Sequence, residues 1–276
     1  TRYGTVTGVQ TCALPISDQQ RSDYLACTGH PTLRTPNIDA MAHSGVTFDR
    51  FYVASPVCMP NRASLMTCRM PTSHGVRSLG LPLSPDHVTF VEVMRAAGYD
   101  TALIGKSHLQ NVSRFPTQYT RKTHRDGFTP PPPELADAIR SNLDAPEYQY
   151  ERQSYWQQQD PIVPTPFYGF DHYDSVLRHG TNTGGDYELW LKRVAPDVLP
   201  LRARDQQFPH EYTVPQAIRT KVPEAYYSTT YIANQACEWL EGRQDNDKPF
   251  FLMVSFPDPH HPFNPPGRYW DMYQRS

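Results

Sequence analysis

A helix-like pattern followed by a strand-like pattern occurs twice in the first half of the chain. A short helix is predicted from about Pro36 until Gly45, and the β-branched and aromatic residues of 46–53 predict a strand directly after it. Apolar residues then recur at helical spacing in 87–97, and the short apolar run 101–105 predicts a second strand. The chain therefore alternates helix and strand.

The same order returns near the carboxyl end, where a helix of about four turns within 226–243 leads into the most apolar run, residues 249–256. Alternation of this kind predicts an α/β fold, an α/β/α sandwich with a mostly parallel central sheet covered by helices on both faces. Sites in such folds lie at the carboxyl ends of strands. That rule selects Cys58 after the first predicted strand, Lys106 and His108 after the second, and His260 after the third.

Residues 109–225 interrupt this pattern with proline-, glutamine- and tyrosine-rich sequence. We predict a loop-rich insertion here rather than a second core, placed to form part of a substrate pocket.

Composition excludes several classes of function. Charged residues make up 20% of the 276 positions, the net charge is -2, and no block of lysine and arginine suggests a nucleic-acid partner. The longest apolar run is far shorter than the roughly 20 residues that span a membrane. The five cysteines form no CxxC pair, so neither a disulfide framework nor a zinc knuckle is indicated.

The first 17 residues differ in origin from the rest in our interpretation. The string "VTGVQTCALPIS" (6–17) fits neither a good strand nor a signal peptide, and it resembles the translation of a common sequencing-adapter oligonucleotide. We therefore expect residues 1–17 to be an artefactual leader and the genuine coding sequence to begin near Asp18. The localisation cannot be predicted from such an amino terminus.

Cys58 has several chemical interpretations. A cysteine in this position is often a small buried hydrophobic residue. A helix beginning near Pro60 would put Cys58 at the positive end of the helix dipole, with Arg62 folding back toward it. That setting favours an anion, and it also favours a thiolate nucleophile.

Two motifs carry a resemblance to a known family. The run "CMPNR" (58–62) is similar to the Cys-x-Pro-x-Arg core of type I sulfatases, and "GYDTALIGKSH" (98–108) is similar to their second signature. The resemblance extends to the segment that starts at Asp18 and to "PFFLMVSFPDPHHPF" around His260, so it covers most of 18–108 and 223–270. It implies an alkaline phosphatase-like fold in which Cys58 is oxidised to formylglycine.

The resemblance also implies roles for the remaining site residues. Asp18, Gln19 and the modified Cys58 are implied ligands of a divalent metal, calcium in the first place, with magnesium or manganese as alternatives. Arg62 would orient the hydrated aldehyde, Lys106 would bind sulfate oxygens, and His108 would be the base that expels sulfate. His260, rather than the neighbouring His261, would contact the leaving-group oxygen. The other histidines weighed for a role are interpreted as structural or substrate-side: His30, His74, His172 and His179.

The sequence departs from the family pattern at three positions and lacks a later element. Asn61 stands where serine or alanine is usual, Cys68 replaces an expected glycine, and Gln19 replaces the second aspartate. A later Asp-Asn or Asp-His metal pair and a second lysine are missing before Ser276. We therefore expect residues 18–276 to be an incomplete amino-terminal catalytic domain, truncated at both ends, with weak metal binding and little turnover by itself.

The predicted activity is hydrolysis of a small-molecule or carbohydrate sulfate ester, with a formylglycine-generating enzyme as a protein partner. Two alternatives remain at this point. One is a phosphodiesterase or phosphonate monoester hydrolase of the same superfamily, although the pair of Lys106 and His108 resembles sulfatases. The other is a glycan-binding protein with an unmodified Cys58, because Trp156, Trp190 and Trp270 can stack on sugar rings.

Overall fold

The computed structural model describes residues 11–112, 127, 143, 145–243 and 247–273. The chain divides into two compact units. The first, which we name the sheet unit, comprises Thr1–Val53, Val91–Ser107 and Pro164–Ser276. The second, which we name the Cys58 unit, comprises Ala54–Phe90 and His108–Val163. Each unit is described by itself.

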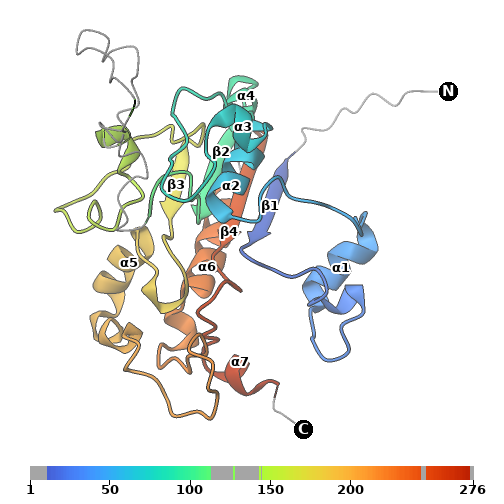
Figure 1. The fold of residues 1–276 in the computed structure, drawn as a ribbon, viewed down its shortest axis with the longest axis vertical. Coiled ribbons are helices and arrows are strands. Elements are labelled where there is room, and N and C mark those ends of the chain that lie inside the picture. Colours follow the sequence, from blue (N-terminus) through green and yellow to red (C-terminus); the bar gives the residue numbers. More distant parts are fainter. Residues whose placement is uncertain (1–10, 113–126, 128–142, 144, 244–246, 274–276) are drawn as a thin grey trace. The chain divides into compact units, whose positions relative to one another are not determined.

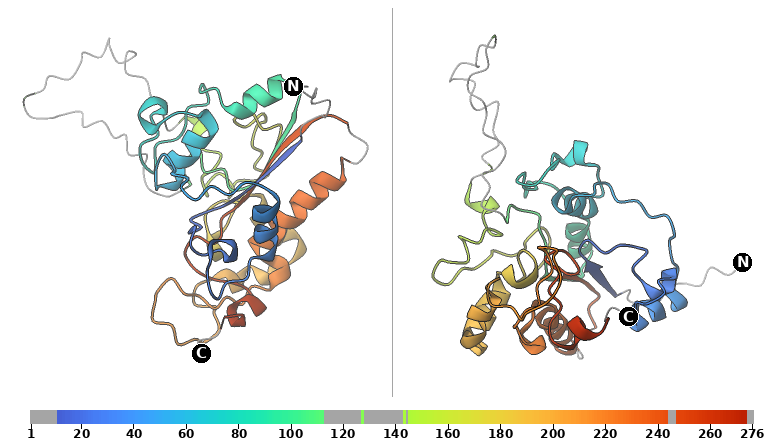
Figure 2. Two further views of the ribbon diagram at one scale, coloured as in Figure 1. Left: turned by 90° about the vertical axis from the view of Figure 1, so that its right-hand side faces the viewer. Right: turned by 60° about the horizontal axis from the view of Figure 1, so that its bottom comes forward.

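Four parallel strands form the sheet of the sheet unit (Figure 1). The strands are β1 (Cys12–Ser17), β2 (Asp100–Gly105), β3 (His172–Ser175) and β4 (Phe250–Phe256), and their spatial order is β1-β4-β2-β3. Figure 2 shows β1 running beside β4, where Ile16 is in register with Ser255. The sheet confirms the predicted α/β fold with a parallel sheet.

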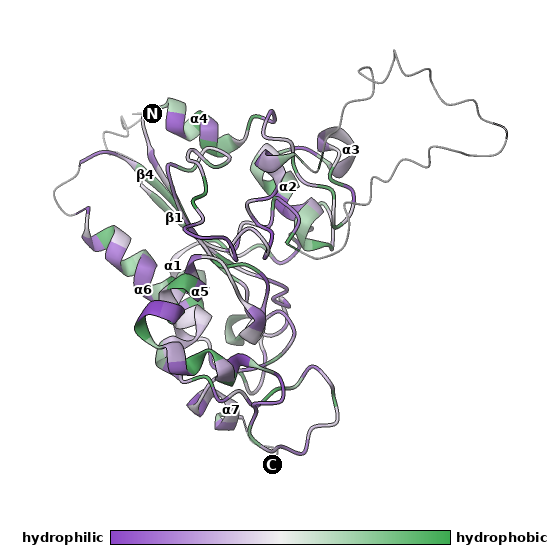
Figure 3. Cartoon of the chain, turned by 90° about the vertical axis from the view of Figure 1, so that its left-hand side faces the viewer, coloured by the Kyte–Doolittle hydropathy of each residue, from purple (hydrophilic) through white to green (hydrophobic). Residues whose placement is uncertain are grey.

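Burial explains why these sequences become strands. The five middle residues of β4 are buried, as expected for a central strand with both faces covered, and Figure 3 shows its hydrophobic colouring. β1 lies at the end of the strand order and is mostly exposed. Pro15 can sit in β1 because an edge strand tolerates a residue without an amide hydrogen.

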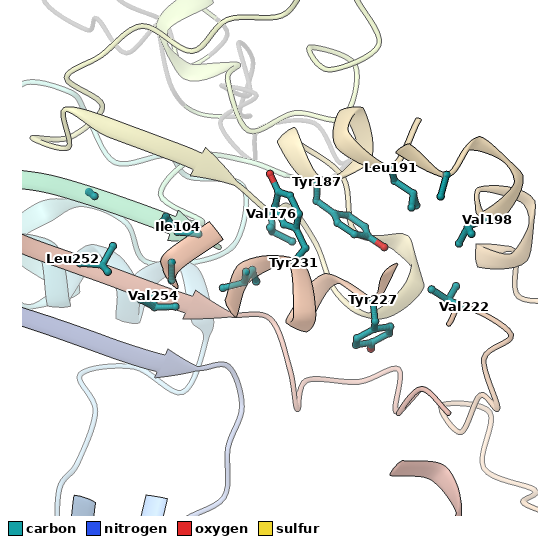
Figure 4. Packing of buried hydrophobic residues seen from close by; sticks show 14 residues of the cluster. Ile104, Val176, Tyr187, Leu191, Val198, Val222, Tyr227, Tyr231, Leu252 and Val254 are labelled. Carbon is teal, nitrogen blue, oxygen red and sulfur yellow. The ribbon is translucent and has the colours of Figure 1, made fainter. Parts of the chain in front are cut away.

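The core of the sheet unit lies between the sheet and two helices, α5 (Asp186–Val194) and α6 (Ser228–Glu241) (Figure 4). Ile104 of β2 and Val254 of β4 point to the same face and pack with Leu191 and Ile232 of the helices. Full burial of one such side chain contributes about 1.5–3 kcal/mol. The helix of about four turns predicted before β4 is therefore confirmed as α6, which buries one stripe of its surface.

A reciprocal hydrogen-bond pair joins β3 to α5. The Asp186 carboxylate accepts from the backbone N–H and the hydroxyl of Ser175, both at 2.8 Å, and the Asp186 N–H donates to the Ser175 hydroxyl oxygen at 3.1 Å. An acidic residue in the first turn also suits the positive end of the helix. The start of α5 is thereby fixed at the carboxyl end of β3.

The sheet unit contains further helices. The helix predicted after Pro36 is confirmed as α1 (Pro36–Ser44), and the helix predicted within 87–97 is confirmed as α4 (Phe90–Ala96), whose first residue belongs to the Cys58 unit. The short helix α7 (Arg268–Asp271) follows later. The 3-10 helices of the sheet unit are Ala26–Thr28, Gly180–Asn182, Pro196–Val198, Pro200–Arg202 and Glu224–Tyr226.

The strand predicted over residues 46–53 is wrong. These residues adopt neither helix nor strand, and the side chains of Phe48, Phe51 and Tyr52 are 71%, 78% and 84% exposed. Strand propensity requires a neighbouring strand to supply hydrogen bonds and packing, and none pairs with this segment among the described residues. Cys58 consequently does not follow a strand.

The Cys58 unit is built around helix α2 (Cys58–Thr67), followed by α3 (Pro71–His74) and the 3-10 helix Pro146–Tyr148. Met59, Ala63 and Met66 are buried and recur at helical spacing, which gives α2 an apolar stripe. The predicted helix after Cys58 is confirmed, although it begins at Cys58 itself rather than near Pro60.

None of the helices in the described ranges is long and apolar enough to cross a membrane; α6 is the longest of them, with 14 residues.

Candidate functional site

Asp18 and Lys106 each follow directly on a strand of the sheet. The backbone N–H of Asp18, after β1, donates to the carbonyl oxygens of Phe256 at 3.1 Å and Asp258 at 3.3 Å. The backbone N–H of Lys106, after β2, donates to the carbonyl oxygen of Ser255 at 2.9 Å. Because parallel strands end at the same edge of a sheet, the hydrogen-bond ladder places both residues at its carboxyl edge.

Gly105 is required for this placement of Lys106. Its φ is +112°, a region that side chains rarely adopt, and a Cβ atom built here would lie 2.0 Å from the carbonyl oxygen of Ser255. The glycine before Lys106 therefore has a backbone role, because it lets the chain leave β2 in close contact with β4.

Lys106 and Asp18 form a buried ion pair. The Lys106 ammonium contacts the Asp18 carboxylate and also donates to Nε2 of His179. The exposed fraction is 1% for Lys106 and 7% for Asp18. Charges this far from water are stable only when paired, so each side chain fixes the ionised state and position of the other.

His179 completes this cluster from the segment after β3. Its Nε2 lies 3.2 Å from Oδ2 of Asp18. Burial lowers the pKa of His179 to about 4, while the nearby Asp18 carboxylate acts in the opposite direction and the Lys106 charge lowers the pKa further. His179 is therefore neutral at pH 7, and its Nε2 can accept a hydrogen bond from Lys106 or bind a metal ion.

His260 lies in the loop after β4 and stacks on His179. The ring centroids are 3.5 Å apart and the planes differ by 8°. Burial lowers the pKa of His260. The ring of His261 also stacks on His260, with the centroids 4.2 Å apart, and its Nδ1 is 3.1 Å from Oε1 of Gln19. Gln19 therefore contacts the histidine loop rather than the Asp18 carboxylate.

Asp258 anchors the loop that carries His260. Its carboxylate accepts hydrogen bonds from the hydroxyls of Thr229 and Tyr227, the latter at 3.3 Å, at the start of α6. Burial raises the pKa of Asp258. The first turn of α6 thus holds the loop, and through it the position of the His260 ring.

A cavity of about 700 Å³ lies beside His260. Its walls are largely apolar and include Ala233 of α6, Pro262, Phe263 and Tyr269. A cavity of this size and lining accommodates a small organic group next to the imidazole.

The cluster fits a divalent metal ion. Ligand atoms of Asp18, His179 and His260 all lie within 4.8 Å of one another. One carboxylate and two imidazoles suit transition-metal ions such as zinc or iron(II), whereas calcium prefers about 6–8 oxygen ligands. Because Lys106 already pairs with Asp18, an ion at this place competes with the ammonium for the carboxylate.

In the Cys58 unit, Cys58 is the first residue of α2, so it does lie at the positive end of a helix dipole. Its thiol is free and half-buried. Arg62 is one turn further along and 5% exposed, and residues four apart share a helix face. The Cys-x-Pro-x-Arg spacing therefore puts a cationic side chain on the helix face of Cys58.

His108 belongs to a turn held by a buried carboxylate. Its φ is +54°, and β2 ends at Gly105, so His108 is not part of the strand. Glu151, which is 0% exposed, accepts the N–H of His108 at 2.7 Å and also the N–H of Gln110. No pattern in the sequence indicates this role for Glu151.

The structure brings together three of the predicted site residues in the sheet unit: Asp18, Lys106 and His260. Gln19 contacts His261, the residue that follows His260. His179 was not among the predicted site residues, since it was interpreted as structural or substrate-side. The available signal was its place shortly after "DHYDSV", a short β-rich run that forms β3, but this run fell within the expected insertion.

Comparisons with known proteins agree with this architecture. A model of the sulfatase family matches residues 14–276. The chain belongs to the sulfatase family, within the alkaline phosphatase-like superfamily.

Individual relatives include sulfatases and a phosphonate monoester hydrolase. An ulvan-active sulfatase of Formosa agariphila is 27% identical over 259 residues, which cover 94% of this chain and 37% of that protein. An arylsulfatase of Clostridium perfringens is 28% identical over 269 residues, covering 95% and 45%. The phosphonate monoester hydrolase of Agrobacterium radiobacter superposes with a TM-score of 0.63 at 25% identity, covering 96% and 44%. The chain thus spans less than half the length of these proteins.

Proposed function

We propose that the protein hydrolyses sulfate monoesters. The observation that carries this proposal is the buried Lys106 cation, held at the carboxyl edge of the sheet beside Asp18, His179 and His260 in a chain of the sulfatase family. A sulfate ester is an anion, and a nucleophile approaches it only where cations offset the charge. A fixed, desolvated ammonium supplies that charge without reorganisation.

Cys58 is proposed to become formylglycine. When hydrated, this group supplies one hydroxyl that attacks sulfur while the S–O bond to the alcohol breaks, and a second whose deprotonation restores the aldehyde and releases sulfate. The position of Cys58 at the positive end of α2 supports an oxyanion there. The proposed role of Arg62 is to orient the diol by donating hydrogen bonds to it.

The proposed roles of the other residues follow from their chemistry. Lys106 donates to sulfate oxygens, and His260 contacts the oxygen of the leaving alcohol. The apolar cavity beside His260 would then take the organic part of that alcohol. His108 is proposed as the base that removes the proton during sulfate release; Glu151, through its backbone hydrogen bond, positions His108.

A divalent cation is proposed at Asp18, with Gln19 and the modified Cys58 as further ligands. His179 and His260 are additional ligand candidates, because their ring nitrogens lie close to the Asp18 carboxylate. When bound, such an ion supplies Lewis acidity toward the sulfate oxygens. Calcium remains the expected ion on the family resemblance, with magnesium or manganese as alternatives, whereas the two imidazoles would favour a transition-metal ion such as zinc.

Substrate and partner are proposed by analogy. The relative from Formosa agariphila is named for activity on ulvan. We propose a carbohydrate or small-molecule sulfate ester as the substrate. The formylglycine proposal also requires a modifying enzyme as a transient partner.

Turnover by the protein made from the full-length gene, in a host with the modifying enzyme, tests the proposal. We expect kcat/KM to be higher for 4-nitrophenyl sulfate than for bis(4-nitrophenyl) phosphate. Lys106→Met should lower kcat on the sulfate about 100- to 1000-fold, and Lys192→Met, which changes an exposed lysine of α5, should leave it unchanged. Full activity of Lys106→Met would contradict the proposed role of this lysine.

A phosphonate monoester hydrolase is the second candidate. It is supported by the superposition on the Agrobacterium radiobacter enzyme and by Gln19, which is compatible with that class. A higher kcat/KM for the phosphate diester, or for a phenyl phosphonate ester, than for the sulfate would replace the first proposal with this one.

A further inference from the structure

A second cavity in the sheet unit, of about 480 Å³, is lined mainly by aromatic and charged side chains. It lies between the segment around Arg219 and the carboxyl-terminal helix α7. The lining includes His210, Tyr212, Arg219, Trp270 and Asp271. None of them takes part in the proposed sulfate chemistry.

Trp270 contacts two of the other aromatic rings that line this cavity. The ring of Tyr212 stands at 88° to the indole with the centroids 5.6 Å apart, and the imidazole of His210 lies 5.3 Å from it. The Tyr212 side chain is 42% exposed. Aromatic rings that are partly open to solvent present a flat apolar surface with polar groups at its edge.

Charged groups surround this aromatic surface. The Arg219 guanidinium lies 3.1 Å from the Asp271 carboxylate and 6.0 Å from the Trp270 ring centroid. Glu211 adds a second carboxylate to the lining. Carboxylates accept hydrogen bonds and a guanidinium donates them, and the hydroxyl groups of a ligand can do both.

The aromatic surface and the charged groups around it together identify a class of ligand. A pyranose ring has an apolar C–H face, which packs on an aromatic ring, and a rim of hydroxyls, which bind carboxylates and guanidinium groups. A purely apolar ligand would take water away from the Arg219–Asp271 pair and from Glu211 without offering them hydrogen bonds. Two carboxylates against one guanidinium disfavour a polyanion, so the lining favours an uncharged sugar ring over a sulfated one.

The backbone connects this cavity to the proposed catalytic edge. The N–H of Ile218 donates to the carbonyl oxygen of Phe263 at 2.9 Å, and the N–H of Phe263 donates to that of Gln216 at 2.7 Å. The segment before Arg219 therefore pairs with the chain directly after the His260 loop. On another side, Tyr273 accepts a hydrogen bond from the N–H of Arg34, in the segment that follows Asp18.

We infer that this cavity is a carbohydrate subsite that binds a neutral sugar ring by stacking on Trp270. On the proposed function, which this last step rests on, the ring is an unsulfated residue of an oligosaccharide whose sulfate ester is cleaved at the sheet edge. The protein then selects sulfated oligosaccharides over small aryl sulfates.

Calorimetric titration with neutral oligosaccharides tests this inference without turnover. The probes are cellohexaose, xylohexaose and neoagarohexaose, and a heparin hexasaccharide serves as the polyanionic comparison. We expect saturable binding of at least one neutral probe, and about tenfold weaker binding to Trp270→Ala and to Arg219→Gln, equivalent to about 1.4 kcal/mol. Tyr52→Ala removes an aromatic side chain that is 84% exposed elsewhere in the sheet unit and should bind as the parent does.

The outcomes separate the two proposals. Absence of saturable binding for all three neutral probes, equal binding by Trp270→Ala, or preference for the heparin hexasaccharide would overturn the subsite. If Trp270→Ala unfolds, binding of the neutral probes is measured on Trp270→Phe and Arg219→Gln instead. Trp270→Phe keeps an aromatic surface, and Arg219→Gln changes only the polar rim. A protein without sulfatase activity can still bind the neutral probes, since these carry no sulfate. Failure of the proposed function would therefore not overturn the subsite.

Discussion

The Lys106 ammonium lies against the Asp18 carboxylate at the carboxyl edge of the sheet, and both side chains are almost completely buried. The ammonium therefore stands where a cation is needed to neutralise Asp18. Any divalent ion that binds Asp18 has to compete with this internal cation. Metal binding and the Lys106 contact are thus alternatives for one carboxylate.

Lys106→Met tests this competition. The substitution leaves the Asp18 charge buried without its ammonium partner, so we expect the free energy of unfolding to fall by about 3–5 kcal/mol. Manganese or calcium should raise the melting temperature of this variant more than that of the parent, because the ion no longer competes with an ammonium.

Thermal unfolding with and without each ion measures both effects. Lys192→Met is the matched control, since Lys192 forms an exposed pair with Glu188 at 2.9 Å and should contribute less than about 1 kcal/mol. Equal metal-induced shifts for parent and Lys106→Met would contradict the competition.

Asp174 should make stability depend on pH. Burial, with a further contribution from the Asp186 charge, raises the pKa of Asp174 from 3.8 to about 7, and the Tyr231 hydroxyl lies 2.8 Å from one carboxylate oxygen. The folded state therefore retains a proton that the unfolded chain releases. Stability is lost as pH rises from about 4 to about 7, at roughly 1.4 kcal/mol per pKa unit.

Asp174→Asn should remove this loss. The amide still accepts a hydrogen bond from Tyr231 but does not ionise, so we expect the variant to gain stability relative to the parent between pH 4 and pH 7, and no more above it. Urea unfolding across that range measures the difference. The exposed Asp205→Asn should reproduce the parent's curve, and a constant offset for Asp174→Asn would contradict the assignment.

Cys68 should be replaceable with a gain in stability. It ends α2 with φ of +55° and ψ of +30°, the left-handed conformation in which a Cβ atom is strained. Cys68→Gly should raise the free energy of unfolding by about 0.5–1 kcal/mol. Cys68→Ala removes the same exposed thiol but keeps the Cβ, so it should bring no such gain; chemical denaturation of both variants compares them directly.

Glu151→Gln should destabilise the turn that carries His108. The carboxylate accepts two backbone N–H groups, whereas an amide offers one oxygen and turns its NH₂ toward the other donor. We expect a loss of about 1–3 kcal/mol. Glu147→Gln, at an exposed position of the same unit, should change the midpoint of unfolding little, and equal losses for the two variants would refute the role of Glu151.

Much of the fold was predictable because local patterns encode it. The helices after Pro36, within 87–97 and before β4 all show periodic apolar residues, and β2 and β4 are short apolar runs that need burial on both faces. The segment 46–53 shows the limit of such patterns. Its residues favour a strand, but a strand also depends on a partner from elsewhere in the chain, which the local sequence does not specify.

The candidate site, like the fold, was predictable only in part. Lys106 and His260 follow predicted strands, so strand-end reasoning located them, whereas Asp18 was found only through the family resemblance. His179 escaped because β3 has only four residues and lies within proline- and tyrosine-rich sequence. Glu151 escaped because its role depends on backbone N–H groups about 40 positions away in the chain, which no sequence spacing reveals.

The central claim is that position 58 carries the nucleophile of a sulfate ester hydrolase. Its most direct test is aldehyde-reactive labelling of the protein made with a formylglycine-generating enzyme, followed by mass analysis of the peptide that contains residue 58. We predict that the label is attached at position 58 and that sulfur is lost there, while Cys68, ten residues later, keeps its thiol. An intact, unlabelled thiol at Cys58 under these conditions would contradict the account.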